Sequence, residues 1–359
     1  MRNPTRFLAF LAALCLLLCG CSAPAVEAEQ ANLNKFSATY YDAFDTVTTV
    51  IGYAPDQQTF DRAFAGAMEL FLRYHQVFDG YNAYDGVNNL YAVNHGAAEG
   101  PVAAEPELID LLLYMKELQP LLNGRVNVAM GAVLSVWHSF REAGVAVPSL
   151  KLLTARSEHC DFDDVIIDAE NGTVYFADPG LSLDLGAVGK GWATEAVAQW
   201  LLASEMPNFI ISAGGNVRCG EKPRDGRDRW GVGVQDPNDI FGTKYIDVLW
   251  LTGLSVVSSG DYQRYYTVDG VRYHHIIDPD TLFPSTYMRQ VTIVTLDSGY
   301  ADALSTALFL MPYEEGRAFV DSLEGVEACW VLNDGTVEYT DGMKALLQSC
   351  GATSTDRIR

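Results

Sequence analysis

The stretch from residue 181 to residue 201, LSLDLGAVGKGWATEAVAQWL, constrains the fold more than any other part of this chain. Leucines alternate with Ser182 and Asp184 at its start, which is the period of an extended strand. Three glycines follow, and apolar residues then recur with helical spacing. At such a junction backbone N–H groups can meet an anion, and glycines permit a close backbone approach. Lys190 adds a positive charge, although a tight turn with a solvated lysine explains the same residues.

The rest of the chain mixes helical and strand periodicity without a strict βαβ repeat. Helices are expected at residues 56–78, 106–122, 126–142 and 301–311, with a further closing segment at 314–323. Strands are expected at residues 38–54, 165–167, 173–177, 208–212, 230–235, 245–250 and 289–295. This mixture predicts an α+β fold, a mixed β-sheet core flanked by helices, rather than a doubly wound parallel sheet.

The first 20 residues have the pattern of a lipoprotein signal peptide. Two arginines precede an apolar stretch that is too short for a comfortable membrane span. The stretch ends in Leu-Cys-Gly-Cys, which resembles the bacterial lipobox and makes Cys21 the lipidated residue; an ordinary signal peptide or an uncleaved anchor is the alternative. We therefore expect a protein held by lipid on the extracytoplasmic face of a bacterial cell membrane. Its parts would be a signal peptide (1–20), a tether (21–35), a catalytic domain (36–345) and a C-terminal tail (346–359).

Charge and cysteine content exclude several classes of site. The chain has 359 residues, 24 of them basic and 46 acidic, for a formal net charge of −22, and no basic run marks a nucleic-acid surface. An anionic substrate would therefore need a metal ion or a few well-placed cations. Four cysteines outside the leader lie too far apart for a zinc or iron–sulfur motif. Disulfide pairing and free thiols both remain possible for Cys160, Cys219, Cys329 and Cys350.

Two further clusters carry residues suited to chemistry. Adjacent His274 and His275 must point to opposite faces of a strand, so only one of them can face a given site. They are the best candidates for acid–base work, although a lone histidine in a strand is more often structural. Asp302 and Thr306 share a helix face and offer hard oxygen ligands of the kind that Mg²⁺ accepts. The competing interpretation is that Asp302 caps the helix and Thr306 bonds its backbone.

Five segments taken in series resemble one known family. They are DLGAVGKGWATE, SAGGN, SGDYQRYY, RYHHIIDPDTLFP and ADALSTALFLM, in this order and at these separations. Together they resemble the FAD:protein FMN transferase family, also called the ApbE family, over about residues 36 to 340. The SAGGN segment alone indicates only a turn or a bulge. The lipoprotein leader is also common in that family.

The resemblance implies both an activity and its residues. Such enzymes cleave the pyrophosphate of FAD and transfer FMN to a threonine hydroxyl of a target flavoprotein, releasing AMP, and the target is expected in a membrane redox complex. By resemblance, Mg²⁺ lies between Asp302, Thr306 and the backbone carbonyl of Ala187. By the same resemblance, His275 takes the proton of the acceptor threonine, with Asp278 as the alternative. The residues implied to contact FAD are Phe44, Tyr84, Arg125, Val126, Asn127, Asp184, Lys190, His275 and Ile276.

The sequence departs from the family pattern in three places. Phe44-Asp45-Thr46 stands where Met-Gly-Thr is usual, Asn127 and Ala129 stand where Asp and Thr are usual, and Leu282 replaces a glycine. These differences concern the flavin contacts and the turn at 278–284 more than the metal site. Two other functions therefore stay open beside the transferase. One is a Mg²⁺-dependent FAD pyrophosphatase that gives FMN and AMP, and the other is a lipoprotein that binds flavin or another solute without chemistry.

Overall fold

The computed structural model describes residues 33–239 and 242–355. The predicted signal peptide, the lipidation residue Cys21 and nearly all of the predicted tether lie outside these residues. The compact unit of the chain begins at Asn34, two residues before the expected start of the domain. Within the described ranges, no helix combines the length and the apolar character that a membrane crossing needs.

An eight-stranded sheet forms the centre of the unit, and each strand runs antiparallel to its neighbours. This arrangement confirms the α+β fold, with an antiparallel core flanked by helices. In sheet order the strands are β1 (Asn34–Ala43), β2 (Thr46–Ala54), β6 (Phe209–Ala213), β7 (Asn216–Cys219), β10 (Ser255–Gly260), β13 (Met288–Thr295), β14 (Glu327–Leu332) and β15 (Val337–Tyr339).

Three smaller sheets surround the large one. One has the order β3-β5-β4, and the other two are the hairpins β8–β9 and β11–β12. Their bounds are β3 (Val102–Ala103), β4 (Val165–Asp168), β5 (Thr173–Phe176), β8 (Trp230–Gln235), β9 (Tyr245–Leu251), β11 (Tyr265–Val268) and β12 (Val271–His274). The hairpin of β11 and β12 bears on function, because His275 directly follows β12.

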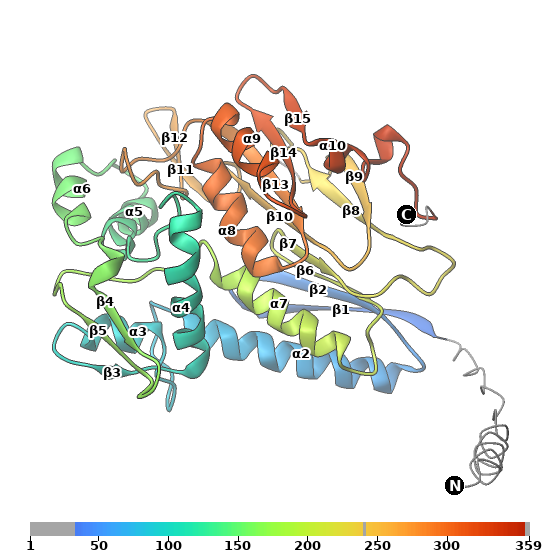
Figure 1. Ribbon diagram of the computed structural model, residues 1–359, viewed down its shortest axis with the longest axis horizontal. Helices are drawn as coiled ribbons and strands as arrows, with labels where there is room; N and C mark the ends of the chain where they lie inside the picture. Colours follow the sequence, from blue (N-terminus) through green and yellow to red (C-terminus); the bar gives the residue numbers. More distant parts are fainter. Residues whose placement is uncertain (1–32, 240–241, 356–359) are drawn as a thin grey trace, which may run out of the picture. The chain divides into compact units, whose positions relative to one another are not determined.

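Helices α2, α7 and α8 lie across one face of the large sheet, as Figure 1 shows. Buried side chains of α2, α7 and β6, among them Phe71, Val197 and Ile211, form a core between these helices and the sheet. The helices are α2 (Gln57–Phe78), α3 (Leu90–Gly96), α4 (Pro106–Leu121), α5 (Gly131–Ala143), α6 (Leu150–Ser157), α7 (Gly189–Leu202), α8 (Ser298–Phe309), α9 (Tyr313–Asp321) and α10 (Asp341–Lys344), with 3-10 turns η1 (Phe162–Asp164) and η2 (Gln348–Cys350).

Three local predictions differ from the structure. The single strand expected at 38–54 is a hairpin, because Phe44 and Asp45 form a two-residue turn with φ values of 54° and 48°. The helix expected from residue 126 begins only at Gly131, because the Asn127 side chain accepts the Ala129 N–H and holds a turn there. The extended start of the opening stretch, 181–185, forms one bridge, from Ser182 to Met130, rather than a full strand.

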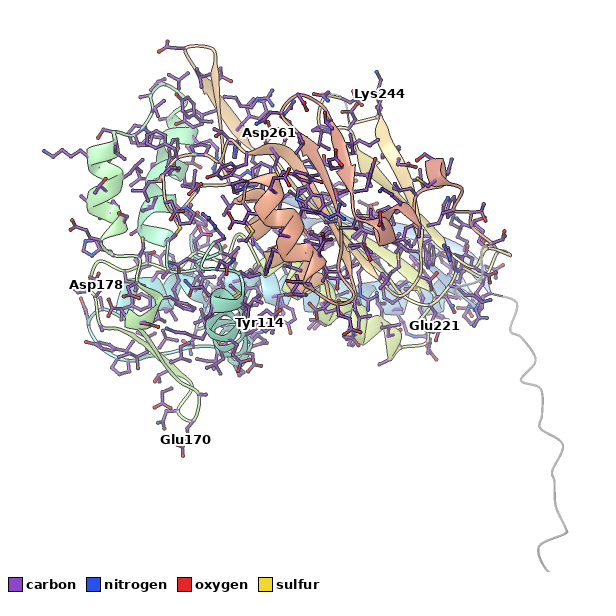
Figure 2. All side chains as sticks on the ribbon, turned by 45° about the horizontal axis from the view of Figure 1, so that its top comes forward. Tyr114, Glu170, Asp178, Glu221, Lys244 and Asp261 are labelled. Atoms are coloured by element: carbon purple, nitrogen blue, oxygen red, sulfur yellow. The ribbon has the colours of Figure 1, made fainter. Side chains whose placement is uncertain are left out.

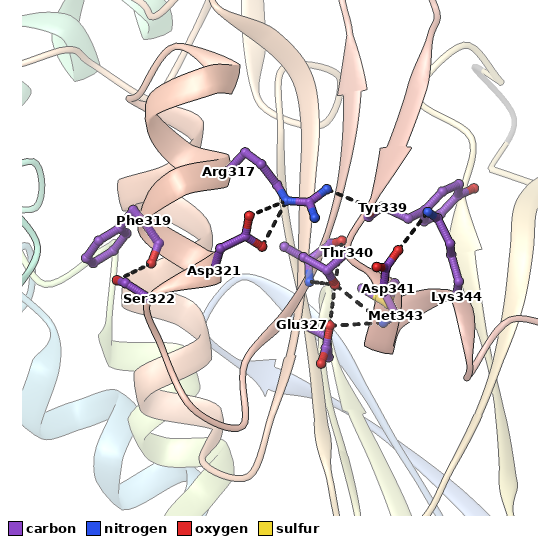
Figure 3. A network of polar contacts seen from close by, with 11 residues as sticks. Arg317, Phe319, Asp321, Ser322, Glu327, Tyr339, Thr340, Asp341, Met343 and Lys344 are labelled. Carbon is purple, nitrogen blue, oxygen red and sulfur yellow. Dashed lines mark hydrogen bonds and ion pairs between the residues drawn. The ribbon is translucent and has the colours of Figure 1, made fainter.

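The C-terminal edge of the large sheet is held by polar contacts (Figure 3). Thr340 donates to the Glu327 carboxylate, which also accepts the Met343 N–H at 3.0 Å, and Arg317 donates to the Tyr339 carbonyl at 3.1 Å. Beyond this edge, the Trp250 N–H of β9 donates to the Leu346 carbonyl at 2.9 Å. The first residues of the predicted C-terminal tail therefore lie against β9.

Candidate active site

The glycine-rich junction of the opening stretch allows α7 and α8 to approach closely. The Gly191 N–H donates to the Asp302 carboxylate at 2.8 Å. A Cβ atom on Gly191 would lie 2.3 Å from the Ser298 carbonyl oxygen and 2.4 Å from the Asp302 Cβ. Any side chain at Gly191 would therefore force the two helices apart. This contact explains why the helix start carries a glycine at that position.

Asp302 and Thr306 lie one helical turn apart on α8 with unused bonding capacity. Asp302 is only 5 % exposed, yet in the described part of the chain its carboxylate pairs with no cationic side chain and accepts a single hydrogen bond, from Gly191. The Thr306 hydroxyl has no hydrogen bond among those residues. Asp297, not Asp302, caps α8 by accepting the Tyr300 N–H at 2.7 Å, so the capping interpretation of Asp302 is wrong.

These oxygens fit a hard divalent cation. Across residues 33–239 and 242–355, no group of three or more His, Cys, Asp or Glu side chains could hold a metal ion. A cation at Asp302 would thus have one acidic ligand and would need the Thr306 hydroxyl, a backbone carbonyl such as that of half-buried Ala187, water or substrate to complete its shell. That is the coordination pattern of Mg²⁺ bound together with a phosphate ligand.

Lys190 joins the opening stretch to the SAGGN segment. Its ammonium donates to the Asn216 side-chain oxygen at 2.5 Å, and Asn216 is 1 % exposed on β7. The Nδ2 atom of Asn216 is buried without a partner in the described structure. Gly214 and Gly215, with φ values of 54° and 101°, make the turn before Asn216. Lys190, Asn216, Asp302 and Thr306 are called the helix-pair group below.

The two adjacent histidines have different roles. His274 donates from Nε2 to the Ser285 carbonyl at 2.7 Å and accepts the Ile276 N–H at Nδ1, so both ring nitrogens are occupied within the fold. His275 has its Nδ1 3.3 Å from the Arg264 carbonyl, which can only accept. Nδ1 of His275 therefore carries the hydrogen, and the lone pair of Nε2 has no hydrogen-bond partner among the described residues. Burial, with the charge of Arg264 second, lowers the pKa of His275 to about 3 and keeps the ring neutral.

Asp278, the alternative base, is engaged in a turn. Its carboxylate accepts the Asp280 N–H at 2.8 Å and the Thr281 N–H at 3.3 Å, and the residue is 1 % exposed. Leu282 ends this turn with a φ of 63°, a left-handed conformation that favours glycine. The geometry therefore favours His275 over Asp278 as the group that accepts a proton. Ile276, beside them, is buried.

Phe44 and Tyr84 meet around His75, a residue that sequence reasoning missed. The Phe44 N–H donates to His75 Nδ1 at 3.3 Å, and the Tyr84 hydroxyl lies 3.4 Å from His75 Nε2. The same hydroxyl donates to Asp79 at 2.8 Å. Burial, together with that bond, raises the pKa of Tyr84 to about 12. No motif marked His75, which looks in sequence like one residue of an amphipathic helix.

The 125–127 turn is also bonded within the fold. Arg125 donates to Asp280 at 2.7 Å, and Asn127 donates to the Cys160 carbonyl at 2.8 Å, while Val126 is buried. The five residues of the flavin prediction outside the opening stretch and the histidine segment are called the turn group below: Phe44, Tyr84, Arg125, Val126 and Asn127.

Asp184 connects the opening stretch to this turn. Its N–H donates to the Val128 carbonyl at 2.8 Å, and its carboxylate accepts the Gly186 N–H at 2.8 Å. Burial raises the pKa of Asp184, and the nearby charges of His138 and Arg141 on α5 lower it in part. Sequence reasoning missed His138 and Arg141 because single polar residues on an amphipathic helix look like a solvated face.

The segments that are far apart in sequence meet in the fold. β7 pairs with β10 through Asn216 and Val257, and Ser259 of β10 lies 2.8 Å from Ser305 of α8, oxygen to oxygen. Ser285, after the histidine segment, donates to the Phe309 carbonyl of α8 at 3.0 Å. The four cysteines left open by the sequence are all free thiols.

Sequence comparison finds relatives over most of this region. The profile of the ApbE family matches residues 44–330. A protein named FAD:protein FMN transferase from Treponema pallidum is 36% identical over 268 residues, which cover 71% of this chain and 73% of that protein. A protein of the same name from Klebsiella pneumoniae is 30% identical over 282 residues, covering 78% of this chain and 84% of that protein.

Solved structures have the same fold. The ApbE protein of Thermotoga maritima superposes with a TM-score of 0.77 at 28% identity, covering 87% of this chain and 99% of that one. The flavin transferase ApbE of Vibrio cholerae has a TM-score of 0.73 at 22% identity, covering 88% of this chain and 100% of that one, and shows likeness of fold alone. With its sequence profile, its relatives and its fold in agreement, the chain belongs to the ApbE family.

Proposed function

We propose that this protein is a FAD:protein FMN transferase, which moves FMN from FAD to a threonine hydroxyl of a target flavoprotein and releases AMP. The names of its relatives support a flavin transferase. The observation that carries the proposal is a set of polar groups on the predicted segments whose bonding capacity the fold leaves partly unused. These are the Asp302 carboxylate and Thr306 hydroxyl of α8, the Lys190 ammonium on its amide partner, and the free Nε2 of His275.

The reaction is a phosphoryl transfer, and its atoms balance with these groups. The threonine oxygen bonds to the phosphorus of the FMN half, and the bond from that phosphorus to the bridging oxygen breaks. AMP leaves with the bridging oxygen and one more negative charge than it had as part of FAD. The hydroxyl proton goes to the Nε2 atom of His275, whose Nδ1–H stays on the Arg264 carbonyl.

Charge neutralisation is the other requirement of phosphoryl transfer. Lys190 supplies one fixed positive charge, which Asn216 orients. Asp302, Thr306 and the Ala187 carbonyl would hold Mg²⁺, and a bound Mg²⁺ would screen the charge of the pyrophosphate. We propose this Mg²⁺ dependence because the net charge of the chain is −22, which leaves few cations for a dinucleotide.

Product analysis tests the proposal directly. The purified protein is incubated with FAD and Mg²⁺, with and without a threonine-containing flavoprotein acceptor, and the products are identified by mass. We expect FMN covalently attached to the acceptor, together with AMP in equal amount, only when the acceptor is present. Free FMN and AMP without acceptor labelling would indicate a pyrophosphatase, and unchanged FAD would indicate a binding protein; either result would overturn the transferase.

We also propose that a lipid at Cys21 holds the protein on the extracytoplasmic face of the cell membrane, where it meets a flavoprotein of a membrane redox complex. The support is the lipobox pattern of the leader, which lies outside the described residues. Cys21→Ser should leave the protein unlipidated, either released from the membrane or with its leader uncleaved. Detergent partitioning and mass analysis measure this, and diacylglycerol on the substituted protein would contradict the proposal.

A further inference from the structure

Four arginines in the described part of this acidic chain have no carboxylate partner. Among the described residues, nine arginines form an ion pair with a carboxylate. Arg289 and Arg272, for example, both face Asp261, which Figure 2 labels. The described arginines that have no such pair are Arg141, Arg156, Arg229 and Arg264. Of these four, Arg264 contacts His275 through its carbonyl, and Arg141 lies on α5, which packs against the β11–β12 hairpin through Trp137.

The backbone carbonyl of Arg264 contacts His275, the proposed base. Arg264 directly precedes β11, and its carbonyl holds the Nδ1 of His275 at 3.3 Å. Its side chain is exposed and makes no hydrogen bond or ion pair within the described structure. The chain has 46 acidic residues against 24 basic ones, yet none of the described carboxylates pairs with Arg264. Its guanidinium is therefore free to bind an anion that approaches His275.

Arg141 approaches the same place from α5. It lies one helical turn after Trp137, so both residues share the face of α5 that meets the β11–β12 hairpin. The Trp137 ring lies 6.0 Å from the Tyr273 ring of β12, and its N–H donates to the Leu282 carbonyl at 2.9 Å. The guanidinium of Arg141 is 2.9 Å from His138 Nδ1 and has no carboxylate partner among the described residues.

Two further observations concern the surroundings of Arg141. Its charge opposes the rise that burial causes in the pKa of Asp184, and it adds to the lowering of the pKa of His275, after burial and nearer groups. Tyr266 of β11 is 8 % exposed, and its hydroxyl has no hydrogen-bond partner in the described structure. The charge of Arg141 also acts on that hydroxyl. The region between α5 and the hairpin thus contains polar groups, the Tyr266 hydroxyl and the Arg141 guanidinium, whose hydrogen-bonding capacity the described fold does not fully use.

We propose that Arg264 and Arg141 bind a phosphate group of the dinucleotide beside His275. This inference rests on the proposed function and assigns two arginines to it. A guanidinium matches the geometry of phosphate oxygens with paired N–H donors. When the pyrophosphate bond breaks, the leaving phosphate gains a negative charge, and two fixed guanidiniums stabilise that charge. The helix-pair group and the arginine pair would then contact the phosphates from two sides.

Binding of inorganic pyrophosphate to the full chain tests the arginines without any turnover. Isothermal titration is carried out on the parent protein, Arg264→Gln, Arg141→Gln and the control Arg156→Gln. We expect the first two variants to bind pyrophosphate about 10- to 100-fold more weakly, the loss expected for a charge-assisted hydrogen bond. Arg156→Gln should bind like the parent, because Arg156 is an exposed arginine of α6 that also lacks a carboxylate partner. Thermal unfolding of each variant verifies folding.

A second readout separates this inference from the proposed function. With FAD and acceptor, Arg264→Gln should lower kcat more than it raises KM for the acceptor, and Arg264→Lys should restore only part of kcat because lysine lacks the planar fork. Parent-like pyrophosphate binding by Arg264→Gln and Arg141→Gln would overturn the inference, as would no binding by the parent. A change only in the KM for the acceptor would also overturn it and would point to an acidic acceptor segment instead. If pyrophosphate binding depends on the two arginines but no FMN is transferred, the inference about the arginines is supported and the proposed transferase function is wrong.

Discussion

The helix-pair group and the turn group differ in how much of their bonding capacity the fold uses. In the helix-pair group, Asp302 has no cationic partner, the Thr306 hydroxyl has no hydrogen bond, and the Asn216 Nδ2 is buried without a partner in the described structure. In the turn group, Tyr84 is bonded to Asp79 and Arg125 to Asp280. The first group has capacity left for a ligand, whereas the second is already satisfied.

The difference indicates which side chains can contribute to the free energy of ligand binding. A buried polar group without a partner costs free energy, so a ligand that satisfies it gains more than the usual net hydrogen bond. A satisfied group must first break an internal bond, so its net gain from a ligand is small. We therefore expect charged parts of the substrate to depend on the helix-pair group, and the turn group to supply shape and a rigid wall. The following substitutions test this contrast.

The largest loss is expected for Asp302→Asn. The amide keeps the size of the side chain and can still accept the Gly191 N–H, but it removes the only acidic ligand of the proposed cation site. FMN transfer should fall on the order of 10³-fold or more, since a metal ion contributes several kcal/mol of charge stabilisation. Thr306→Ala should cost less, because a neutral ligand is more readily replaced by water.

Rates are measured with FAD and acceptor over a Mg²⁺ titration, and EDTA should abolish the parent activity until Mg²⁺ is restored. Melting temperatures of Asp302→Asn and the parent should agree within a few degrees, which separates lost chemistry from lost folding. Parent-like transfer by Asp302→Asn at low Mg²⁺ concentration would rule out this cation site.

His275→Asn should lower transfer by about 10²- to 10⁴-fold, the usual contribution of a positioned base, while FAD affinity stays close to that of the parent. FAD titration and acceptor labelling in the same folded sample measure the two effects. A loss of FAD binding equal to the loss of rate would instead assign His275 a structural role.

The pH dependence of stability gives an independent check on His275. Its pKa is about 3 in the folded chain, whereas an unperturbed histidine has a pKa of about 6.5. Between these values the unfolded chain binds more protons than the folded chain, so this residue makes stability fall as the pH drops from about 6.5 toward 3. The parent should therefore lose stability over this range more steeply than His275→Asn in denaturant unfolding at several pH values. Parallel profiles would show that the ring is not buried as described.

Gly191→Ala should destabilise the fold by about 1 to 3 kcal/mol, the usual cost of overpacking, because its Cβ would meet the Ser298 carbonyl. Gly189→Ala is the matched control two residues away, since its Cβ would be 3.4 Å from the Phe78 side chain, an ordinary contact. Urea unfolding of both variants measures the difference. Equal stabilities would mean that α7 and α8 are not packed so closely.

Of these substitutions, Tyr84→Phe should change the function of the protein least, and the quantity measured is FAD affinity. It removes one hydrogen bond to Asp79, which still accepts the Tyr81 and Asn82 N–H groups. The loss of FAD affinity should stay below about fivefold, because a net hydrogen bond is worth about 1 kcal/mol. FAD titration measures it. A loss of FAD affinity far above fivefold would show that the contrast between the two groups is wrong.

Periodic patterns in the sequence predicted the elements that depend on near neighbours. The helix expected at 56–78 is α2, capped by the Asp56 side chain, and the strand expected at 230–235 is β8. A hydrophobic period and a capping residue act within a few positions, so both are visible in a short window. The turn at Phe44 and Asp45 was missed because phenylalanine rarely adopts a positive φ and no glycine marks the turn.

The sequence by itself determined which segments carry the chemistry, because residue types such as Asp302, Thr306 and Lys190 and their glycine neighbours are local facts. Only the tertiary structure decided which of these residues has free capacity. The bond from Gly191 to Asp302 joins residues 111 positions apart, and the carbonyl that orients His275 belongs to Arg264, which directly precedes the other strand of the hairpin. Hydrogen-bond partners come from chain folding rather than from sequence neighbours. For that reason the fold alone distinguished His275 from His274 and brought Arg141 to the same place.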